Sequence, residues 1–167
     1  MVDLSSTVRR GHPIAFGIFA LLAFIVAVIS SAVVASFNSN EQPKDNLVRD
    51  STRFLIFAGW WGFLFSIVYI GLFLSGIGGF LSSIASHAVF IILTWIFWLA
   101  GSAALSSAVG NADCSNPASG IPQCSALRAI CAFGWIGWLE LTFMLAVIGY
   151  LAFKAFNGGR GMNDGFA

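Results

Sequence analysis

Long apolar runs alternate with short polar stretches along the whole chain. There are four such runs, and each is longer than the roughly 20 apolar residues that a helix needs to cross the hydrocarbon core of a bilayer. The alternation therefore predicts an all-α protein, namely a four-helix transmembrane bundle of up-down-up-down topology. The predicted spans are about residues 14–37, 54–75, 84–109 and 127–156 of the 167-residue chain, so that residues 14–156 form one membrane domain.

The first run could instead be a secretory signal peptide. Two arginines precede it, and Val33-Val34-Ala35 resembles a cleavage site. The apolar region of a signal peptide has only about 7–15 residues, so residues 14–37 are too long and we interpret them as a retained span. Pro13 lies where the first helical residue is expected, because that position tolerates the missing N–H. Residues 1–13 would then be a short polar N-terminal segment.

The most polar segment, residues 38–53, separates the first two runs. We interpret it as a water-exposed loop without a binding role. Its second half should begin the second helix early, because Pro43 suits a first turn. Two pairs of opposite charges have the spacing of side chains that meet on one helix face: Asp45 with Arg49, and Asp50 with Arg53.

The remaining connections differ in character. Residues 76–83 are rich in glycine and serine and carry no charge, which predicts a tight antiparallel hairpin between the second and third spans. Residues 110–125 contain two prolines and two glycines, which are typical of an irregular loop. The glycine-rich tail, residues 157–167, is predicted to have no fixed structure.

Small residues mark the faces on which the spans should pack. Glycines one turn apart flank two tryptophans in the second span, at Gly59 and Gly62, and Gly134 and Gly137 repeat the pattern in the fourth. Such positions let helix backbones approach closely, whereas a lipid or sterol slot is the less favoured alternative. Because tryptophan favours the membrane interface, Trp60 and its neighbour are expected near the charged-loop end of their span. A further stripe of small residues in the first span comprises Ala20, Ala23, Ala27, Ser31 and Ala35.

Composition supports the membrane interpretation and excludes several functions. Hydrophobic residues make up 58% of the chain and charged residues 9%, against about a quarter charged in a typical soluble domain. A net charge of +1 argues against a nucleic-acid partner. The lysines and arginines form no cluster dense enough to suggest binding to an anionic lipid surface. Membrane lipids are the expected surroundings.

The orientation in the membrane depends on two cysteines. Positive charges divide evenly between the two faces, so the positive-inside rule makes no choice. Cys114 and Cys124 share one short loop, and such a pair persists as a disulfide only in an oxidising compartment. We therefore expect the loop in the lumen or outside the cell and both termini in the cytosol, in the plasma membrane or an endomembrane. Two free thiols on the cytosolic side are the alternative; Cys131 is expected to be a buried hydrophobe.

Glu140 is the main candidate for chemistry, since it is the one acid inside a predicted span. An acid at the centre of a span costs on the order of 2.5–3.5 kcal/mol on insertion scales. It could be a proton or cation site, or an anchor for a donor of a partner. The favoured interpretation is structural: a protonated or hydrogen-bonded side chain held within the bundle, because the sequence offers neither a cation at comparable depth nor a second acid. Its expected partners are Thr94, the indole of Trp95 or Trp98, and Ser66.

The sequence contains no motif for a cofactor, a metal or an enzyme. It has no phosphate-binding loop and no nucleophile elbow. His87 could be a ligand or a proton relay, but no other histidine, cysteine or acid lies within helical reach, so a polar residue at headgroup level is expected. No catalytic residue, cofactor, metal or small-molecule substrate is predicted.

Taken together, the four spans, the chargeless hairpin and the cysteine-bracketed loop resemble the MARVEL family. The stretch Trp98-Leu99-Ala100-Gly101-Ser102-Ala103-Ala104-Leu105 is similar to its small fungal members, as is Cys114…Cys124 followed by Leu127-Arg128-Ala129. Some branches of the family carry charges in the first and third spans, whereas here the only intramembrane acid is Glu140.

The resemblance implies a non-enzymatic protein that organises membrane microdomains, membrane-protein assemblies or vesicle traffic, through self-association or contact with other membrane proteins. Two alternatives stay open: a small ion or proton channel or transporter that uses Glu140, and an accessory subunit of a membrane complex.

Overall fold

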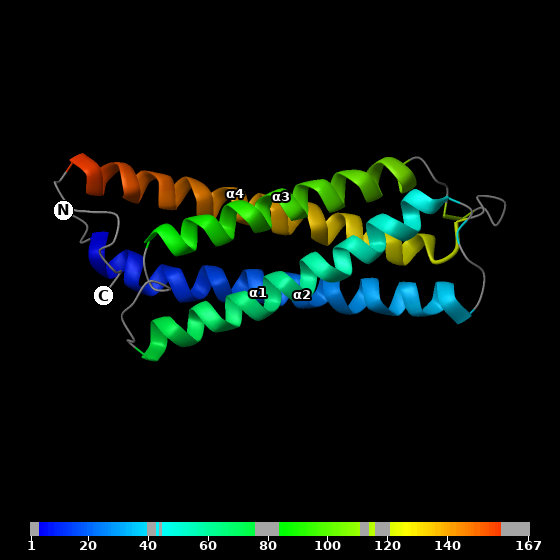
Figure 1. The fold of residues 1–167 in the computed structure, drawn as a ribbon, viewed down its shortest axis with the longest axis horizontal. Helices are drawn as coiled ribbons and strands as arrows, with labels where there is room; N and C mark the ends of the chain where they lie inside the picture. The colour runs from blue at the N-terminus through cyan, green and yellow to red at the C-terminus, as the bar shows by residue number, and fades with distance from the viewer. Residues whose placement is uncertain are drawn as a thin grey trace.

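The protein is built from four long helices. The computed structural model describes residues 4–39, 43, 45–75, 84–110, 114–115 and 121–157, and no strand occurs among them. All four helices are long and apolar enough to cross a membrane, so the expected class, an all-α protein with four helices able to span a membrane, is confirmed. The helices are α1 (Leu4–Ser39), α2 (Asn46–Ser75), α3 (Ile84–Val109) and α4 (Cys124–Asn157) (Figure 1). The predicted hairpin at 76–83 and nearly all of the tail lie outside the described residues.

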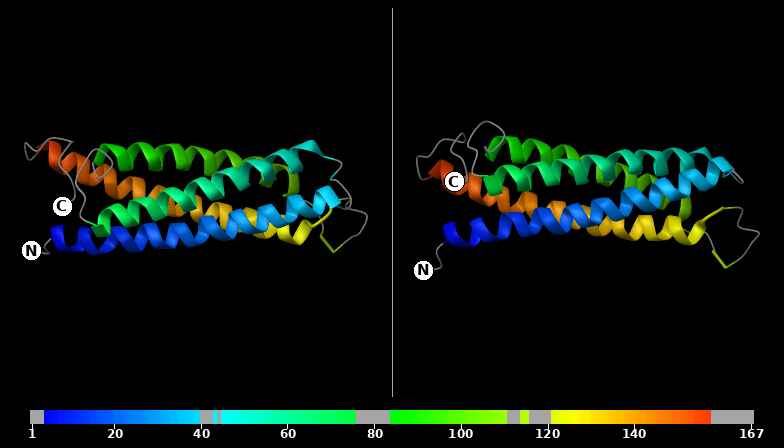
Figure 2. Two further views of the ribbon diagram at one scale, coloured as in Figure 1. Left: turned by 60° about the horizontal axis from the view of Figure 1, so that its bottom comes forward. Right: turned by 90° about the horizontal axis from the view of Figure 1, so that it is seen from below.

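The helices pack side by side along one long axis. Each packs against two others, so that α1 and α3 both contact α2 and α4. Consecutive helices run in opposite directions, and α1 begins at the end of the bundle where α4 finishes (Figure 1, Figure 2). Aromatic side chains fill the centre between α1 and α3: the rings of Phe19 and Trp98 are 5.2 Å apart and those of Phe16 and Phe90 6.4 Å.

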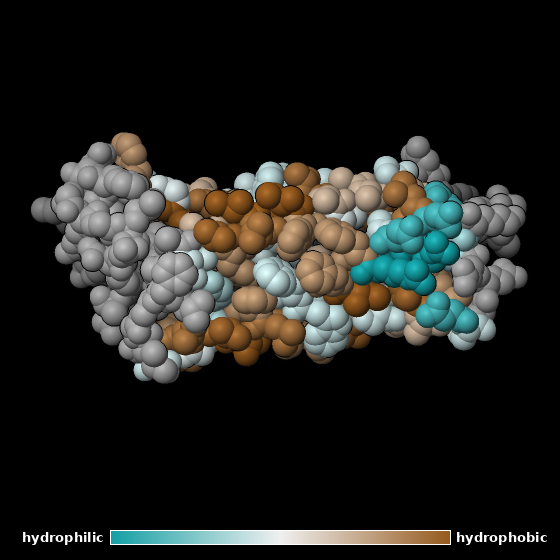
Figure 3. Space-filling model, in the orientation of Figure 1, coloured by the Kyte–Doolittle hydropathy of each residue, from teal (hydrophilic) through white to brown (hydrophobic). Residues whose placement is uncertain are grey.

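The outer surface of the bundle is apolar. Large hydrophobic side chains point outward from every helix, with exposed fractions up to 73% at Leu74 and 67% at Phe143. Polar residues gather over the start of α2, at one end of the face shown in Figure 3. Exposed apolar patches of this extent are rare on monomeric soluble proteins, but hydrocarbon is an environment in which they carry no cost.

Glycine allows α1 and α2 to approach closely. A Cβ built at Gly59 would lie 2.8 Å from the backbone nitrogen of Ala27 and 3.0 Å from the carbonyl oxygen of Ala23. At Gly62 the same atom would lie 3.1 Å from the ring of Phe19. The two backbones therefore touch where both helices carry small residues, as in other membrane helix pairs.

Two side chains of α3 pack against two glycines of α4. Trp98 is fully buried, and a Cβ at Gly137 would collide with its six-membered ring. One turn away, a Cβ at Gly134 would lie 2.5 Å from the hydroxyl of Ser102. The α3–α4 contact thus differs from the α1–α2 contact, because a bulky indole rather than a second backbone occupies the space that glycine leaves.

The first helix begins before the position that the sequence suggested. Pro13 was expected as a first helical residue, but α1 begins at Leu4 and Pro13 lies inside it. Proline removes a single backbone donor, here the one that would bond to the carbonyl of Arg9. The helix continues through that gap into the apolar run.

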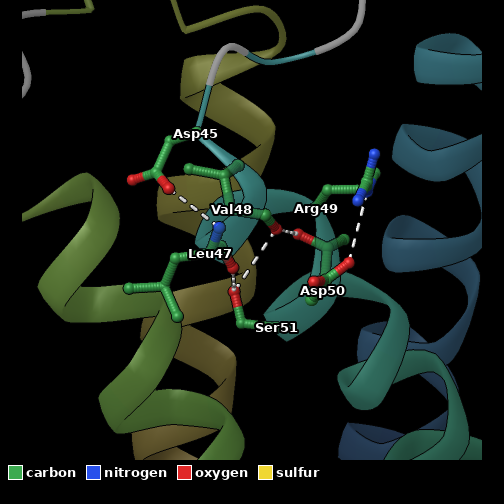
Figure 4. Close-up of polar contacts among 7 residues, drawn as sticks. Asp45, Leu47, Val48, Arg49, Asp50 and Ser51 are labelled. Atoms are coloured by element: carbon green, nitrogen blue, oxygen red, sulfur yellow. Dashed lines mark hydrogen bonds and ion pairs between the residues drawn. The ribbon is translucent and has the colours of Figure 1, made fainter.

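The second helix begins early, as predicted, but its charges are arranged differently. Asp45 does not pair with Arg49: its carboxylate accepts a hydrogen bond from the Leu47 N–H at 2.8 Å, which caps the start of the helix. Asp50 does not pair with Arg53, because its carboxylate bonds Arg49 at 3.2 Å instead (Figure 4). The predicted spacing was available, but a backbone donor and an adjacent arginine compete for the same carboxylates.

The tryptophans of α2 lie at the middle of the helix and not at its charged end. Trp60 and Trp61 are 14 and 15 residues after Asn46 in a helix of 30 residues. The indole N–H of Trp61 donates to Thr94 of α3 at 3.2 Å. A partner inside the bundle satisfies this donor, so the tryptophan does not need the wet interface that its usual preference suggested.

The start of α4 is joined to its neighbours by a disulfide and a hydrogen bond. Cys114 and Cys124 form the expected disulfide, with Cα atoms 5.4 Å apart. The residue before α4, Gln123, has φ 57°, its carbonyl accepts from the Leu127 N–H at 3.0 Å, and its side-chain amide donates to Ser36 of α1 at 3.2 Å. The Gln123–Ser36 bond holds the start of α4 beside the end of α1.

Candidate intramembrane polar site

Glu140 lies midway along α4 and is half-buried. Its Oε2 atom is shielded and has no hydrogen-bond partner. The preceding turn presents Gly137 to Trp98, and the buried Leu141 follows directly. The carboxyl group is therefore held at the edge of a packed apolar contact, with one oxygen turned away from the exterior.

The expected partners of Glu140 are engaged elsewhere or unpaired. The Thr94 hydroxyl donates to the Phe90 carbonyl at 2.7 Å and accepts from Trp61. The Trp95 indole donates to Thr142 at 2.8 Å. The indole nitrogen of Trp98 and the hydroxyl of Ser66 are buried without any hydrogen-bond partner. No hydrogen bond thus joins Glu140 to these four side chains, because two of them bond other groups and two bond none.

Side-chain hydrogen bonds that the sequence did not suggest join neighbouring helices. Trp61 bonds Thr94 and the Tyr69 hydroxyl lies 2.7 Å from the Ser86 hydroxyl, which link α2 to α3. Trp95 bonds Thr142, and Trp135 donates to Ser106 at 2.9 Å, which link α3 to α4. In each pair an aromatic side chain meets a hydroxyl of the neighbouring helix; the three indoles donate, and either hydroxyl can donate in the Tyr69–Ser86 pair. The two α2–α3 pairs have the same sum of residue numbers, as expected for an antiparallel register, and this regularity is the signal that would have found them; the two α3–α4 pairs do not share a sum.

His87 lies inside the bundle and not on its surface. Its side chain is 3% exposed, with its ring 4.3 Å from that of Tyr69 and edge-on to Phe16 at 5.8 Å. The sequence led us to expect a polar residue at headgroup level and did not predict this burial. Packing against two aromatic rings accounts for the position of this imidazole.

Metal-ligand geometry is absent from the part of the chain that the structure describes, where no three histidine, cysteine or acidic residues come together. Among the residues that the structure describes, Glu140 is the carboxylic acid that has a buried oxygen without a hydrogen-bond partner. The arrangement can hold a proton or accept a hydrogen bond from a donor that the described residues do not supply.

Four helices long and apolar enough to cross a membrane, with Glu140 inside the last of them, are features of an integral membrane protein. The chain belongs to the MARVEL family: the model of this family, described as a membrane-associating domain, matches residues 9–151. The resemblance inferred from the cysteine loop and the spans is thus confirmed at the level of the family, which is a non-enzymatic, membrane-associating type of domain. Comparison with curated proteins and with solved structures gave no match.

Proposed function

We propose that this MARVEL protein is a non-enzymatic organiser of membranes, which gathers membrane proteins or copies of itself into microdomains or transport vesicles. The observation that carries the proposal is the contrast between interior and exterior. The interior is filled by side chains such as Trp98 and Phe19, while every helix presents large apolar side chains outward. Because the interior is filled and the exterior is apolar, such a protein would act through lipids and proteins that contact its outer surface within the membrane.

The same proposal includes four crossings of the bilayer with both termini in the cytosol. The disulfide lies at the end of the bundle where α2 and α4 begin, and α1 begins at the other end (Figure 1). Because the bond requires an oxidising compartment, that end belongs in the lumen or outside the cell. The opposite end then faces the cytosol.

Lateral association can be tested by crosslinking in native membranes. A photoreactive amino acid replaces Phe143, which points outward from α4, and in a matched variant it replaces the fully buried Leu141. We expect discrete larger adducts from position 143, containing a second copy or another membrane protein, and intramolecular products alone from position 141. Monomer at both positions would contradict the proposal.

A second candidate function is a proton or cation conductor, and one observation favours it: the shielded Oε2 of Glu140 has no hydrogen-bond partner. If Glu140 carries protons, Glu140→Gln should abolish flux in liposomes that contain the purified protein. If the natural protein shows no flux, or if the variant shows the same flux, the conductor is rejected and the membrane organiser remains the proposed function.

A further inference from the structure

An arginine stands above an aromatic surface on the outer face of α2. The exposed positions recur at steps of three and four residues, which places them on one stripe of the helix. The stripe comprises Asp50, Arg53, Phe57, Trp60 and Leu64. It therefore changes from charged to aromatic to aliphatic along the direction in which the helix enters the membrane.

Arg53 is the charged residue of this stripe that the described part of the protein leaves without an ion-pair partner. Asp50, the acid nearest to Arg53 on this face, is bonded to Arg49 at 3.2 Å (Figure 4). Among the residues that the structure describes, no ion pair involves Arg53. Asp45, the other described acid near the start of α2, accepts a hydrogen bond from the Leu47 N–H, so neither described carboxylate is bonded to the exposed guanidinium of Arg53.

The position of Arg53 suits the headgroup region of a bilayer. It lies seven residues after Asn46, about 10 Å along the helix. Long side chains on a helix point toward its N-terminus, and an arginine stem can lie on apolar surface while its charge reaches the headgroups. From Arg53 to Leu64 the helix rises about 16 Å, which is close to one leaflet of a hydrocarbon core of about 30 Å.

Aromatic rings form the surface below the arginine. Phe57 is 49% and Trp60 37% exposed, and Trp60 packs edge-on to Phe24 of α1 with ring centroids 6.1 Å apart. The surface is thus shared by two helices that are held together at Gly59. Because packing already fixes these rings, an acyl chain that lies against them would cost them little further side-chain entropy.

We propose that Arg53, Phe57 and Trp60 bind one phospholipid whose headgroup carries a net negative charge. The planar guanidinium forms two parallel hydrogen bonds to the phosphate, and an acyl chain lies along the two aromatic side chains. An anionic headgroup supplies the counter-charge that Arg53 lacks among the described residues, whereas a zwitterionic lipid brings its own cation to the site. The site does not depend on self-association or on a protein partner.

Arg128 provides a matched comparison within the same chain. It is also exposed and lies one turn after Cys124, at the same end of the bundle. The exposed positions that follow it along α4 are Ala132, Ile136 and Leu139, so it has a positive charge without an aromatic surface. If anionic lipid were attracted to any exposed cation, both arginines would contribute to its binding. A specific site would depend on Arg53 alone.

The proposal is tested with the full-length protein in phosphatidylcholine vesicles that contain a minor fraction of brominated lipid, since bromine on an acyl chain quenches nearby tryptophan. We expect brominated phosphatidylglycerol to quench the natural protein more than brominated phosphatidylcholine at the same fraction. This excess should disappear in Arg53→Gln and persist in Arg128→Gln. Trp60→Phe should remove the fluorescence that carries the excess, because Trp60 is the exposed indole.

Three results would overturn the site. They are equal quenching by the two lipids, an excess that survives Arg53→Gln, and an excess that Arg128→Gln removes to the same extent. Helix content by circular dichroism and a single peak in size-exclusion chromatography establish that each variant is folded. Arg53→Lys keeps the charge but not the paired hydrogen bonds, so it should retain only part of the excess; full loss there with unchanged Arg53→Gln would also contradict the proposal.

Discussion

At the scale of single residues, Gly59 is a position where the bundle leaves no room for added volume. Its neighbours across the contact are backbone atoms of α1, which cannot rotate out of the way. In the same helix, Gly71 has nothing within 4 Å of the position that a Cβ would occupy. The two glycines therefore separate the effect of packing from the intrinsic preference of glycine and alanine for helix.

Gly59→Ala should lower the stability of the bundle, because α1 and α2 must move apart to admit the methyl group. Overpacking of this kind costs typically about 1–3 kcal/mol, which can be measured by unfolding in mixed detergent micelles. Gly71→Ala should be neutral or slightly stabilising, since alanine is the better helix former. Equal stability of the two variants would mean that the helices do not approach as closely as Gly59 indicates.

Thr94 allows a second test at this scale. Thr94→Val keeps the shape of the side chain but removes the acceptor for the Trp61 indole, so a buried donor loses its partner. Hydrogen bonds between membrane helices contribute on average about 0.6 kcal/mol, and we expect a loss of about that size or somewhat more in the free energy of unfolding. Ser75→Ala, which removes a hydroxyl bonded only within its own helix, should have a smaller effect.

The partners of Thr94 and Glu140 show where prediction from residue type stops. The sequence identifies both as polar groups inside apolar runs, and the structure places both within helices. It does not identify Trp61 as the partner of Thr94, which is 33 residues away. That pairing depends on the register between α2 and α3, and register follows from packing and from the length of the connection, neither of which a run of apolar residues specifies.

At the scale of elements, an apolar run marks where a helix meets hydrocarbon and not where the helix ends. The four runs predicted four helices because every backbone group in a bilayer must be satisfied internally. The ends depend on local contacts: α1 continues through Pro13, and α2 begins at the residue after Asp45, whose carboxylate caps it. Polar residues continue helical hydrogen bonding beyond the apolar stretch, so hydrophobicity alone does not locate them.

Asp45→Ala should destabilise the first turn of α2. Loss of an N-terminal cap costs about 0.5–2 kcal/mol, and hydrogen exchange of the amides after residue 45 should rise as that turn opens. Asp45→Asn retains an oxygen that accepts from the Leu47 N–H, so its exchange should stay close to that of the natural protein. Equal effects of alanine and asparagine would show that charge rather than capping is the role of this carboxylate.

At the scale of the whole molecule, the antiparallel packing links the side of the membrane on which the termini lie to the side on which the disulfide lies. The ends of α1 and α4 that carry the chain termini lie at one end of the bundle, and the Cys114–Cys124 disulfide lies at the other. If the bundle crosses the bilayer four times, the two termini share a compartment and the cysteine loop faces the opposite one. The requirement of the disulfide for oxidising conditions then decides which compartment is which.

Sealed microsomes whose outer face is the cytosolic face test both the number of crossings and the orientation of the bundle. Short epitope tags at the two termini should be removed by added protease, while thiols of Cys114 and Cys124 should react with a membrane-impermeant maleimide only after reduction and permeabilisation. Because Cys131 also carries a thiol, a Cys114→Ser/Cys124→Ser variant provides the background. Protection of one tag alone would contradict four crossings, whereas protection of both tags with an accessible loop would reverse the orientation but leave the bundle intact. Four bilayer crossings are thus inferred from the packing of the apolar helices, whereas the end that faces the cytosol is inferred from Cys114 and Cys124.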